Sequence, residues 1–160
     1  MKPFVYDQLT RIGLPYTVVE HPAVFTIADM QQLDFPANAV IAKNLLLRNA
    51  KGAQHYLLVV DADQQIDVKA LKEKLGSTRL SFVSEERLHT YLGLAKGAVS
   101  PFGLLNDPDK HVTVYLDQAL DSERLIGVHP NDNTATVFLT FADLIKFIAH
   151  TDHQVHLLNF

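Results

Sequence analysis

The stretch that most constrains the fold runs from Ala42 to Arg48 and reads AKNLLLR. Its apolar residues fall at both odd and even positions, which is typical of a strand covered on both faces near the middle of a sheet. Strand alternation places Lys43 on one face with two leucines and Asn44 on the other. A lysine on such a face either extends its ammonium group to solvent at the strand end or serves a binding site in a cleft. Taken alone, the segment favours the first interpretation.

The composition indicates a globular protein that needs no covalent cross-links. With 160 residues and 48% hydrophobic content, the chain can bury a core in a single domain, residues 1–160. It contains no cysteine, which excludes disulfides and thiolate chemistry. We find no signal peptide or membrane-spanning stretch, and therefore expect a cytoplasmic protein with no membrane partner. The net charge of −4 argues against broad electrostatic binding, including to DNA, but leaves room for a local basic patch.

Helical and strand periods alternate along the chain, with capping residues and turns between them. Helices are predicted at 3–12, 26–36, 67–76, 84–93 and after Thr140, and strands at 16–20, 42–48, 54–60, 79–83, 111–116, 125–128, 134–139 and 155–158. The segments 42–48 and 54–60 are expected to form a β-hairpin. The fold class that follows is α/β, of the α+β type, with a mixed, largely antiparallel central sheet surrounded by helices.

The segment from Gly93 to Pro108 is rich in glycine and proline, but it has too many apolar residues for a solvated linker. We expect a loop that folds against the body of the domain, of the kind that often carries functional groups. Ser100 lies in this loop, but not in the Gly-x-Ser-x-Gly arrangement of a serine hydrolase. The chain also lacks the glycine motifs that bind nucleotide phosphates.

The histidines provide two candidate sites. His150, His153 and His156 form an H-x-x-H-x-x-H tract, but it crosses from a helix end into a strand, and no carboxylate pattern completes a ligand set. We therefore expect no metal site and no cofactor, and interpret the tract as one histidine near a helix end and two surface residues. His129 ends a predicted strand, where side chains often face a cleft, although His129-Pro130 also reads as a turn-marking pair.

The acidic residues do not suggest a general acid and base. Glu85 and Glu86 fall in the first turn of a predicted helix, where acids are favoured, and Asp61 and Asp63 fall in a turn. What remains is a strand lysine, a glycine–proline loop and a strand-end histidine. Loop N–H groups can hold an ester carbonyl or a water, and a lysine can bind a phosphate. This set suits an activated ester whose cleavage mainly requires positioning.

Three segments, in order and spacing, are similar to those of a known family. They begin at Lys43 (KNLLLR), Gly97 (GAVSPFGL) and His129 (HPNDNTAT). Together with YTVVEHP from Tyr16 to Pro22, they resemble the YbaK/ProX family of aminoacyl-tRNA editing domains over essentially the whole chain. The resemblance implies the fold of the editing domain of bacterial prolyl-tRNA synthetase. It also implies a trans-editing aminoacyl-tRNA deacylase, a hydrolase that cleaves the ester of mischarged tRNA.

The resemblance also implies roles for particular residues. In the family the strand lysine is needed for activity and is assigned to the tRNA 3′ end, a role that carries over to Lys43 with Asn44 beside it. The loop that begins at Gly97 shapes the aminoacyl pocket, and His129 lines that pocket and excludes larger side chains. The further loop residues expected to contact the substrate are Ala98, Val99, Ser100, Pro101 and Phe102.

The residue after the strand lysine bears on the substrate. Asn44 resembles the branch of the family that removes alanine from tRNA(Pro), whereas the branch that removes cysteine more typically has threonine there. Ala-tRNA(Pro) is therefore expected, with Cys-tRNA(Pro), Ser- or Thr-charged tRNA, or a non-catalytic tRNA-binding role as alternatives. In the expected mechanism Lys43 contacts a terminal phosphate, the Gly97 loop orients the carbonyl and a water, and the free ribose hydroxyl assists. Recruitment by prolyl-tRNA synthetase or an elongation factor is left open.

Overall fold

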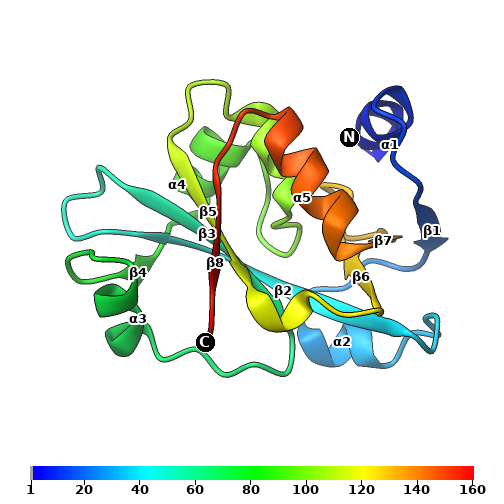
Figure 1. Ribbon diagram of the computed structural model, residues 1–160, viewed down its shortest axis with the longest axis horizontal. Coiled ribbons are helices and arrows are strands. Elements are labelled where there is room, and N and C mark those ends of the chain that lie inside the picture. The colour runs from blue at the N-terminus through cyan, green and yellow to red at the C-terminus, as the bar shows by residue number, and fades with distance from the viewer. Residues whose placement is uncertain (1) are drawn as a thin grey trace.

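Two long strands form the centre of the molecule. The computed structural model describes residues 2–160 and pairs β2 (Ala39–Arg48) antiparallel with β3 (His55–Asp61). Strand β3 is buried at every residue but its last, as expected for a strand covered on both faces. The predicted hairpin and its position in the middle of the sheet are confirmed (Figure 1).

The sheet has the strand order β1-β7-β6-β2-β3-β5-β8, with β4 paired to β2 outside this path. The remaining strands are β1 (Thr17–Glu20), β4 (Ser81–Phe82), β5 (Val112–Asp117), β6 (Leu125–Val128), β7 (Ala135–Leu139) and β8 (Val155–Leu158). The pairs β2–β6, β3–β5 and β5–β8 are parallel, and β1–β7, β6–β7, β2–β3 and β2–β4 are antiparallel. The predicted mixed sheet is therefore confirmed.

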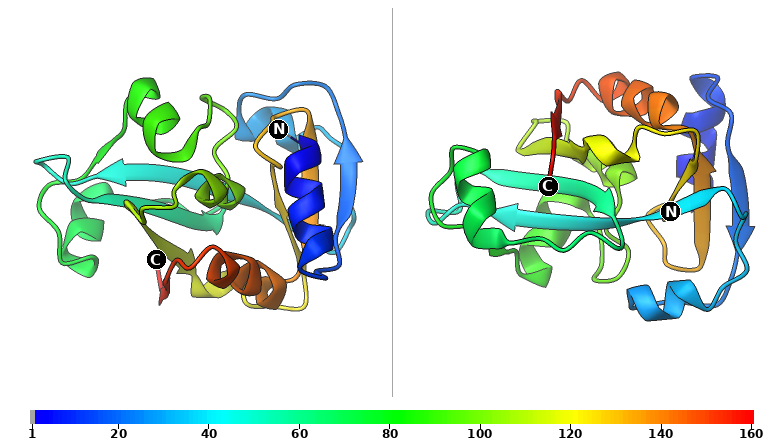
Figure 2. Two further views of the ribbon diagram at one scale, coloured as in Figure 1. Left: turned by 90° about the horizontal axis from the view of Figure 1, so that it is seen from above. Right: turned by 60° about the horizontal axis from the view of Figure 1, so that its bottom comes forward.

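Helices cover the two faces of the sheet unequally. They are α1 (Lys2–Arg11), α2 (Ile27–Gln31), α3 (Val68–Lys74), α4 (Glu85–Leu92) and α5 (Phe141–His150), with 3-10 helices η1 (Pro101–Asn106) and η2 (Gln118–Leu120). Helices α1, α4 and α5 pack in the larger hydrophobic cluster and α3 in a smaller one. Figures 1 and 2 show α4 and α5 across the central strands from α3. None of the helices in residues 2–160 combines the length and apolar character needed to cross a bilayer.

Alternation along β2 separates the two clusters. Leu46 packs in the larger cluster and Leu47 in the smaller one. Because side chains of a strand alternate between faces, Asn44 shares the face of Leu46, and Lys43 shares the face of Leu47. The prediction that these two neighbouring polar residues point to opposite faces is confirmed.

Most helices begin at their predicted caps. Thr26 and Asp29 form a capping box at the start of α2, with hydrogen bonds in both directions. The side chains of Asp67, Ser84 and Thr140 accept backbone hydrogen bonds at the starts of α3, α4 and α5. Since these bonds join residues close in sequence, they could be predicted without knowledge of the fold.

The connection after α4 differs from the predicted loop, because part of it is helical. The hydroxyl of Ser100 accepts a hydrogen bond from the N–H of Phe102 at 3.1 Å and begins η1. Phe102 is fully buried, and its ring packs edge-on against Phe147 of α5 with 4.9 Å between centroids. The apolar residues of this segment therefore serve the core, which explains why it is not a solvated linker.

The strand predicted at 79–83 is shorter than expected. Only β4, Ser81–Phe82, pairs with β2. Val83 adds a single bond from its N–H to the carbonyl of Leu46 at 3.2 Å, and Ser84 then begins α4 as its N-cap. The start of the helix ends the strand.

The histidine tract near the C-terminus contains one buried member. His153 and Asp107 have side chains only 1% exposed, and His153 Nε2 lies 2.9 Å from Asp107 Oδ2. The Asp107 carboxylate also accepts from the N–H groups of His111 and Val112, and His153 Nδ1 lies 2.8 Å from Thr151 Oγ1. The interpretation of His153 as a surface residue is therefore wrong. Within residues 2–160, no group of three or more His, Asp or Glu side chains is placed to hold a metal ion.

Candidate active site

The candidate site begins at a gap in the hydrogen bonding of β2. One edge of β2 pairs with β3, but the other pairs with β6 only over residues 39–41 and with β4 only over residues 47–48. Between these two pairings, residues 42–45 have no strand beside them on that edge within the part of the chain that the structure describes. We call this stretch the open edge of β2.

The open edge presents the backbone carbonyl of Ala42 and both backbone groups of Asn44, because the register with β6 assigns the N–H of Ala42 to Gly127. The carbonyl of Ile41 accepts from Ala62 on the β3 side at 2.9 Å, whereas that of Leu46 bonds on the opposite side. Because successive residues of a strand direct their N–H and C=O groups to alternate edges, Ala42 and Asn44 direct theirs away from β3. Backbone groups shielded from water need a partner, so this edge is suited to bind a polar ligand.

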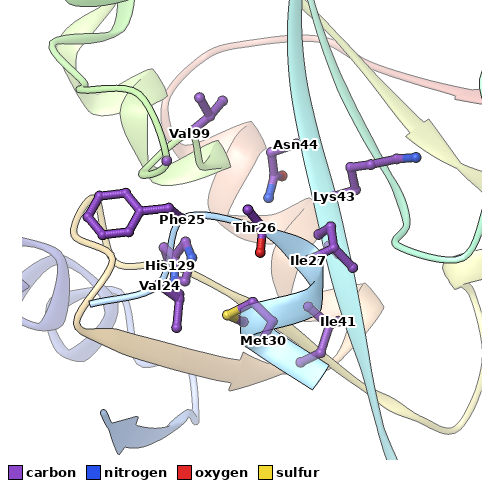
Figure 3. A pocket seen from close by; sticks show the side chains of 12 residues that line it. Val24, Phe25, Thr26, Ile27, Met30, Ile41, Lys43, Asn44, Val99 and His129 are labelled. Carbon is purple, nitrogen blue, oxygen red and sulfur yellow. The ribbon is translucent and has the colours of Figure 1, made fainter. Parts of the chain in front are cut away.

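A cavity of about 180 Å³ lies against the open edge. Phe25 and His129 lie across it from β2, with Met30 and Ile41 at one end and Val99 at the other (Figure 3). Its lining residues come from the start of α2, from β2, from the turn before η1 and from the end of β6. They are Val24, Phe25, Thr26, Ile27, Met30, Ile41, Ala42, Lys43, Asn44, Gly97, Val99 and His129. Drug-sized ligands occupy pockets of roughly 300–1,000 Å³, so this cavity suits a smaller group.

The turn between β6 and β7 holds the α2 side of the cavity. The side-chain amide of Asn133 donates to the carbonyl of Val24 at 2.7 Å, and the N–H of Val24 donates to the carbonyl of Asn133 at 3.1 Å. The N–H of His21 donates to the carbonyl of Thr134 at 3.0 Å. These bonds bring the start of α2 beside His129, although the two are far apart in sequence.

His129 directly follows β6 and offers one ring nitrogen to the cavity. Its Nδ1 lies 2.9 Å from the carbonyl oxygen of Ala135, and because a carbonyl only accepts, Nδ1 carries the hydrogen. Burial lowers the pKa of His129 below its usual 6.5, and the hydrogen bond to Ala135 only partly opposes this effect. At neutral pH the ring is therefore uncharged, and Nε2 keeps a lone pair without a protein partner in residues 2–160. That atom can accept a hydrogen bond from a water or an ammonium group.

A second histidine packs near His129. The rings of His21 and His129 lie 6.0 Å apart between centroids. His21 Nδ1 lies 2.8 Å from the carbonyl of Pro22, and its Nε2 lies 2.9 Å from the hydroxyl of Thr136. Since both of its nitrogens have partners, His21 supports the wall of the cavity and leaves the free nitrogen to His129.

Lys43 and Asn44 leave β2 in different directions, as Figure 3 shows. The amide of Asn44 lines the cavity, and its Oδ1 is buried with no hydrogen-bond partner in the described residues. Such an unpaired group calls for an explanation, and a bound ligand supplies one. Lys43 borders the cavity, but its ammonium group donates to the carbonyl of Gln64 at 2.6 Å, so its charge is directed away from His129.

The predicted loop residues divide between the cavity wall and the core. Gly97 and Val99 line the cavity, whereas the structure buries the others away from it: Ala98, Ser100, Pro101 and Phe102. Gly97 has a φ of 86°, a conformation that other residues rarely adopt, and its N–H has no acceptor within residues 2–160. The buried members hold the loop in place and do not reach the cavity.

Sequence reasoning missed the wall contributed by the start of α2. Val24 and Met30 are buried there, while Phe25 is 71% exposed although it lines the cavity. The capping box located the helix but did not indicate that it lies against β2. That placement depends on Asn133, whose sequence signal was only that of a turn. The exposed ring of Phe25 indicates this wall, but its exposure can be recognised only in the folded structure.

These groups are suited to position a substrate, and none of them is a strong nucleophile. Among residues 2–160, no carboxylate or serine lines the cavity, and the charged residue that borders it is Lys43. The available groups are a neutral histidine acceptor, a side-chain amide, a loop N–H and a strand edge. They suit the attack of a bound water on an ester that is already activated.

Comparison with known families identifies the class. Residues 21–147 match the family model described as an aminoacyl-tRNA editing domain. The chain belongs to this family, and the match includes all of the cavity-lining residues. The enzyme class expected from the sequence, an aminoacyl-tRNA deacylase, is confirmed.

Individual relatives agree with this assignment. The chain is 51% identical over 147 residues to the prolyl-tRNA editing protein ProX of Acetoanaerobium sticklandii, covering 92% of this chain and 90% of the relative. It is 32% identical over 97 residues to the multifunctional Ser/Thr-tRNA deacylase ProXp-y of Escherichia coli K12, covering 59% and 58%. A crystal structure described as a candidate trans-editing enzyme for prolyl-tRNA synthetase has a TM-score of 0.72 and 25% identity, covering 99% and 96%. The predicted resemblance and fold class are confirmed.

Proposed function

We propose that this protein hydrolyses mischarged tRNA in trans and prefers Ala-tRNA(Pro). The observation that carries this proposal is the small cavity between the open edge of β2 and the unpaired Nε2 of His129. A volume of about 180 Å³ suits a small aminoacyl group. The relative from A. sticklandii is named as a prolyl-tRNA editing protein, which supports tRNA(Pro) as the carrier.

In this proposal the amino acid lies along the open edge of β2. Its α-ammonium group donates to a backbone carbonyl of Ala42 or Asn44, and the N–H of Gly97 faces the ester carbonyl. Charge-assisted hydrogen bonds of this kind are roughly twice as strong as neutral ones. The strand edge thereby binds the α-ammonium group, which all amino acids share, and the cavity walls contact the side chain.

The reaction needs one water. We assign that water to Nε2 of His129, which accepts a hydrogen bond from it and directs its oxygen to the ester carbonyl carbon. The N–H of Gly97 stabilises the oxyanion that forms. The bond to the ribose oxygen then breaks, that oxygen takes the proton released by the attacking water, and the free amino acid and uncharged tRNA leave. The neighbouring ribose hydroxyl assists the attack.

Lys43 anchors a terminal phosphate of the tRNA in this proposal, and Asn44 contacts the aminoacyl group. To reach the phosphate, the ammonium group must leave the carbonyl of Gln64. The exchange is favourable because a phosphate is charged and the carbonyl is neutral. The flexible four-carbon stem of lysine permits it.

Size selects the substrate. Val24, Met30 and Ile41 give the cavity apolar walls, and Ala98, Ser100, Pro101 and Phe102 act indirectly by supporting Gly97 and Val99. A synthetase has difficulty rejecting an amino acid smaller than its own, since a missing methylene is worth only about 1–3 kcal/mol. A second site that admits alanine and excludes proline complements it.

Serine- or threonine-charged tRNA and Cys-tRNA(Pro) are the second candidates. The relative from E. coli is named as a Ser/Thr-tRNA deacylase, and Thr26 and Asn44 could bind a polar side chain in the cavity. In either case we place the protein in the cytoplasm as a single editing domain. Recruitment by prolyl-tRNA synthetase or an elongation factor would compensate for its net charge of −4, which disfavours binding of the negatively charged tRNA.

A panel of charged tRNAs tests the substrate. Ala-tRNA(Pro), Cys-tRNA(Pro), Ser-tRNA, Thr-tRNA and Pro-tRNA(Pro) are each incubated with the protein, and kcat/KM for release of the amino acid is compared. We expect Ala-tRNA(Pro) to be hydrolysed fastest and Pro-tRNA(Pro) to be spared. A faster reaction with another mischarged tRNA would identify that tRNA as the substrate, and rapid loss of Pro-tRNA(Pro) would contradict selection by size.

Lys43→Ala tests the anchor. We expect it to lower kcat/KM by roughly 10- to 150-fold, the value of a hydrogen bond to a charged group, and to leave the fold intact. Lys74→Ala is the matched control, because Lys74 Nζ also donates to a backbone carbonyl, that of Asn159, at 2.6 Å but at another site. Equal rates for the two variants would remove Lys43 from the mechanism.

A further inference from the structure

A second hollow lies at the other end of the open edge. It has a volume of about 530 Å³ and is bounded by β2, by β4 and by the start of α4. Leu46 and Leu88 are buried in its lining, whereas Phe82 of β4 is 60% exposed. Lys96 contributes a cation to its wall and Glu85 an anion. We call this hollow the Phe82 groove.

The groove adjoins the cavity. Asn44 and Val99 line both the cavity and the Phe82 groove, and therefore lie where the two hollows meet. The β2–β6 pairing bounds one end of the open edge and the β2–β4 pairing the other. A ligand held in the cavity can therefore extend along β2 into the groove without crossing a paired strand.

The chemistry of the groove fits single-stranded nucleic acid. Sites for single strands combine aromatic side chains, on which bases stack, with cations that contact the backbone. Phe82 offers an exposed ring and Lys96 an ammonium group at the same groove. The volume exceeds that of the cavity about threefold, which suits nucleotides and not a second amino acid.

We propose that the Phe82 groove binds the nucleotides that precede the aminoacylated adenosine of tRNA, with one base stacked on Phe82 and one phosphate paired with Lys96. This inference rests on the proposed function, because it uses the aminoacyl group in the cavity to set the direction of the strand. It assigns to Phe82 and Lys96 a binding role and not a catalytic one. Glu85 faces the same groove and repels a phosphate, so the phosphate lies on the Lys96 side.

Substrates of increasing length test the groove. The same amino acid is supplied as the ester of adenosine, of the trinucleotide C-C-A and of full tRNA, and kcat/KM is measured for each. We expect Phe82→Ala to lower kcat/KM by roughly 5- to 150-fold for the trinucleotide and the tRNA, the value of one stacked base, and to leave the adenosine ester unchanged. Phe82→Trp should retain the wild-type values, since a larger ring also stacks. Phe4→Ala, which removes another exposed phenylalanine, is the control.

The charged residues sharpen the test. Lys96→Ala should weaken the reaction of the trinucleotide and reduce its salt dependence, and Glu85→Gln should strengthen it. Binding of uncharged C-C-A, followed by fluorescence or NMR, tests the groove independently of hydrolysis. If the wild type binds C-C-A through Phe82 but hydrolyses no ester, the groove is supported and the proposed function fails. Equal loss for all three esters, or C-C-A binding that ignores Phe82, would overturn the groove proposal alone.

Discussion

His129 and His153 each follow the end of a regular element, but their ring nitrogens have opposite environments. Nδ1 of His129 donates to the carbonyl of Ala135, and Nε2 remains without a partner in the described residues beside the cavity. His153 has Asp107 at one nitrogen and Thr151 at the other, and its side chain is 1% exposed. One ring nitrogen of His129 lacks a hydrogen-bond partner in the described residues, whereas both ring nitrogens of His153 have partners within the fold.

We interpret this difference as one between the ligand-binding role proposed for His129 and the role of His153 in stabilising the fold. A buried polar group normally finds its partners within the protein, as His153 does. A group that lacks a partner is costly unless a ligand supplies one. Residue type and sequence position would not have distinguished the two, since the tract containing His153 looked more like a metal site than His129 did.

Removing His129 should produce the largest effect. We expect His129→Ala to lower kcat for deacylation by roughly 10²- to 10⁴-fold, because the water loses the acceptor that orients it. His129→Asn is the sharper variant, since its amide can keep the bond to Ala135 but does not extend to the position of Nε2. Both variants should unfold in urea close to the wild-type midpoint. Retained activity in His129→Asn would show that the free nitrogen is not used.

Removing His153 should have the reverse signature. We expect His153→Ala to lower the free energy of unfolding by roughly 1–3 kcal/mol, because it leaves the buried Asp107 carboxylate without one of its partners. Activity per folded molecule should stay at the wild-type value. His156→Ala, which changes an exposed histidine of the same tract, is the control. If His153→Ala lost activity without losing stability, His153 would not have the purely stabilising role that distinguishes it from His129.

The pH profile should show the smallest effect. Burial holds the pKa of His129 below 6.5, so the neutral form of the ring predominates from neutral pH down to about 6.5. We expect kcat/KM to fall with decreasing pH about a midpoint below 6.5, because protonated Nε2 can no longer accept a hydrogen bond. The unfolded chain takes up this proton at higher pH than the folded one, so stability should also decline as pH falls below about 6.5. A profile with its midpoint at or above pH 6.5 would contradict the free acceptor.

Local features of the fold were predictable from the sequence. The hairpin of β2 and β3 follows from apolar runs around a turn, and the caps at Thr26, Asp67, Ser84 and Thr140 follow from bonds within a few residues. The opposite directions of Lys43 and Asn44 follow from strand alternation alone.

Non-local features were not predictable. The gap between β6 and β4 arises because both strands pair with the same edge of β2 at different positions, and no local pattern sets that register. The α2 wall depends on Asn133, and the burial of Phe102 depends on Phe147. The segments that carry the site were found by resemblance to a family, while the bond from Lys43 to Gln64 appeared only in the structure.

The open edge of β2 also bears on whether another strand can pair with the protein there. Unpaired strand edges are templates for other chains, and proteins usually block them with charges, prolines or covering helices. Here the unpaired stretch spans only residues 42–45, because the pairing with β6 bounds it at one end and the pairing with β4 at the other. An incoming strand would need a longer run to pair stably, so the edge excludes strands by its shortness. This stretch can thus keep backbone hydrogen-bonding groups available to a small ligand without being a long template for another strand.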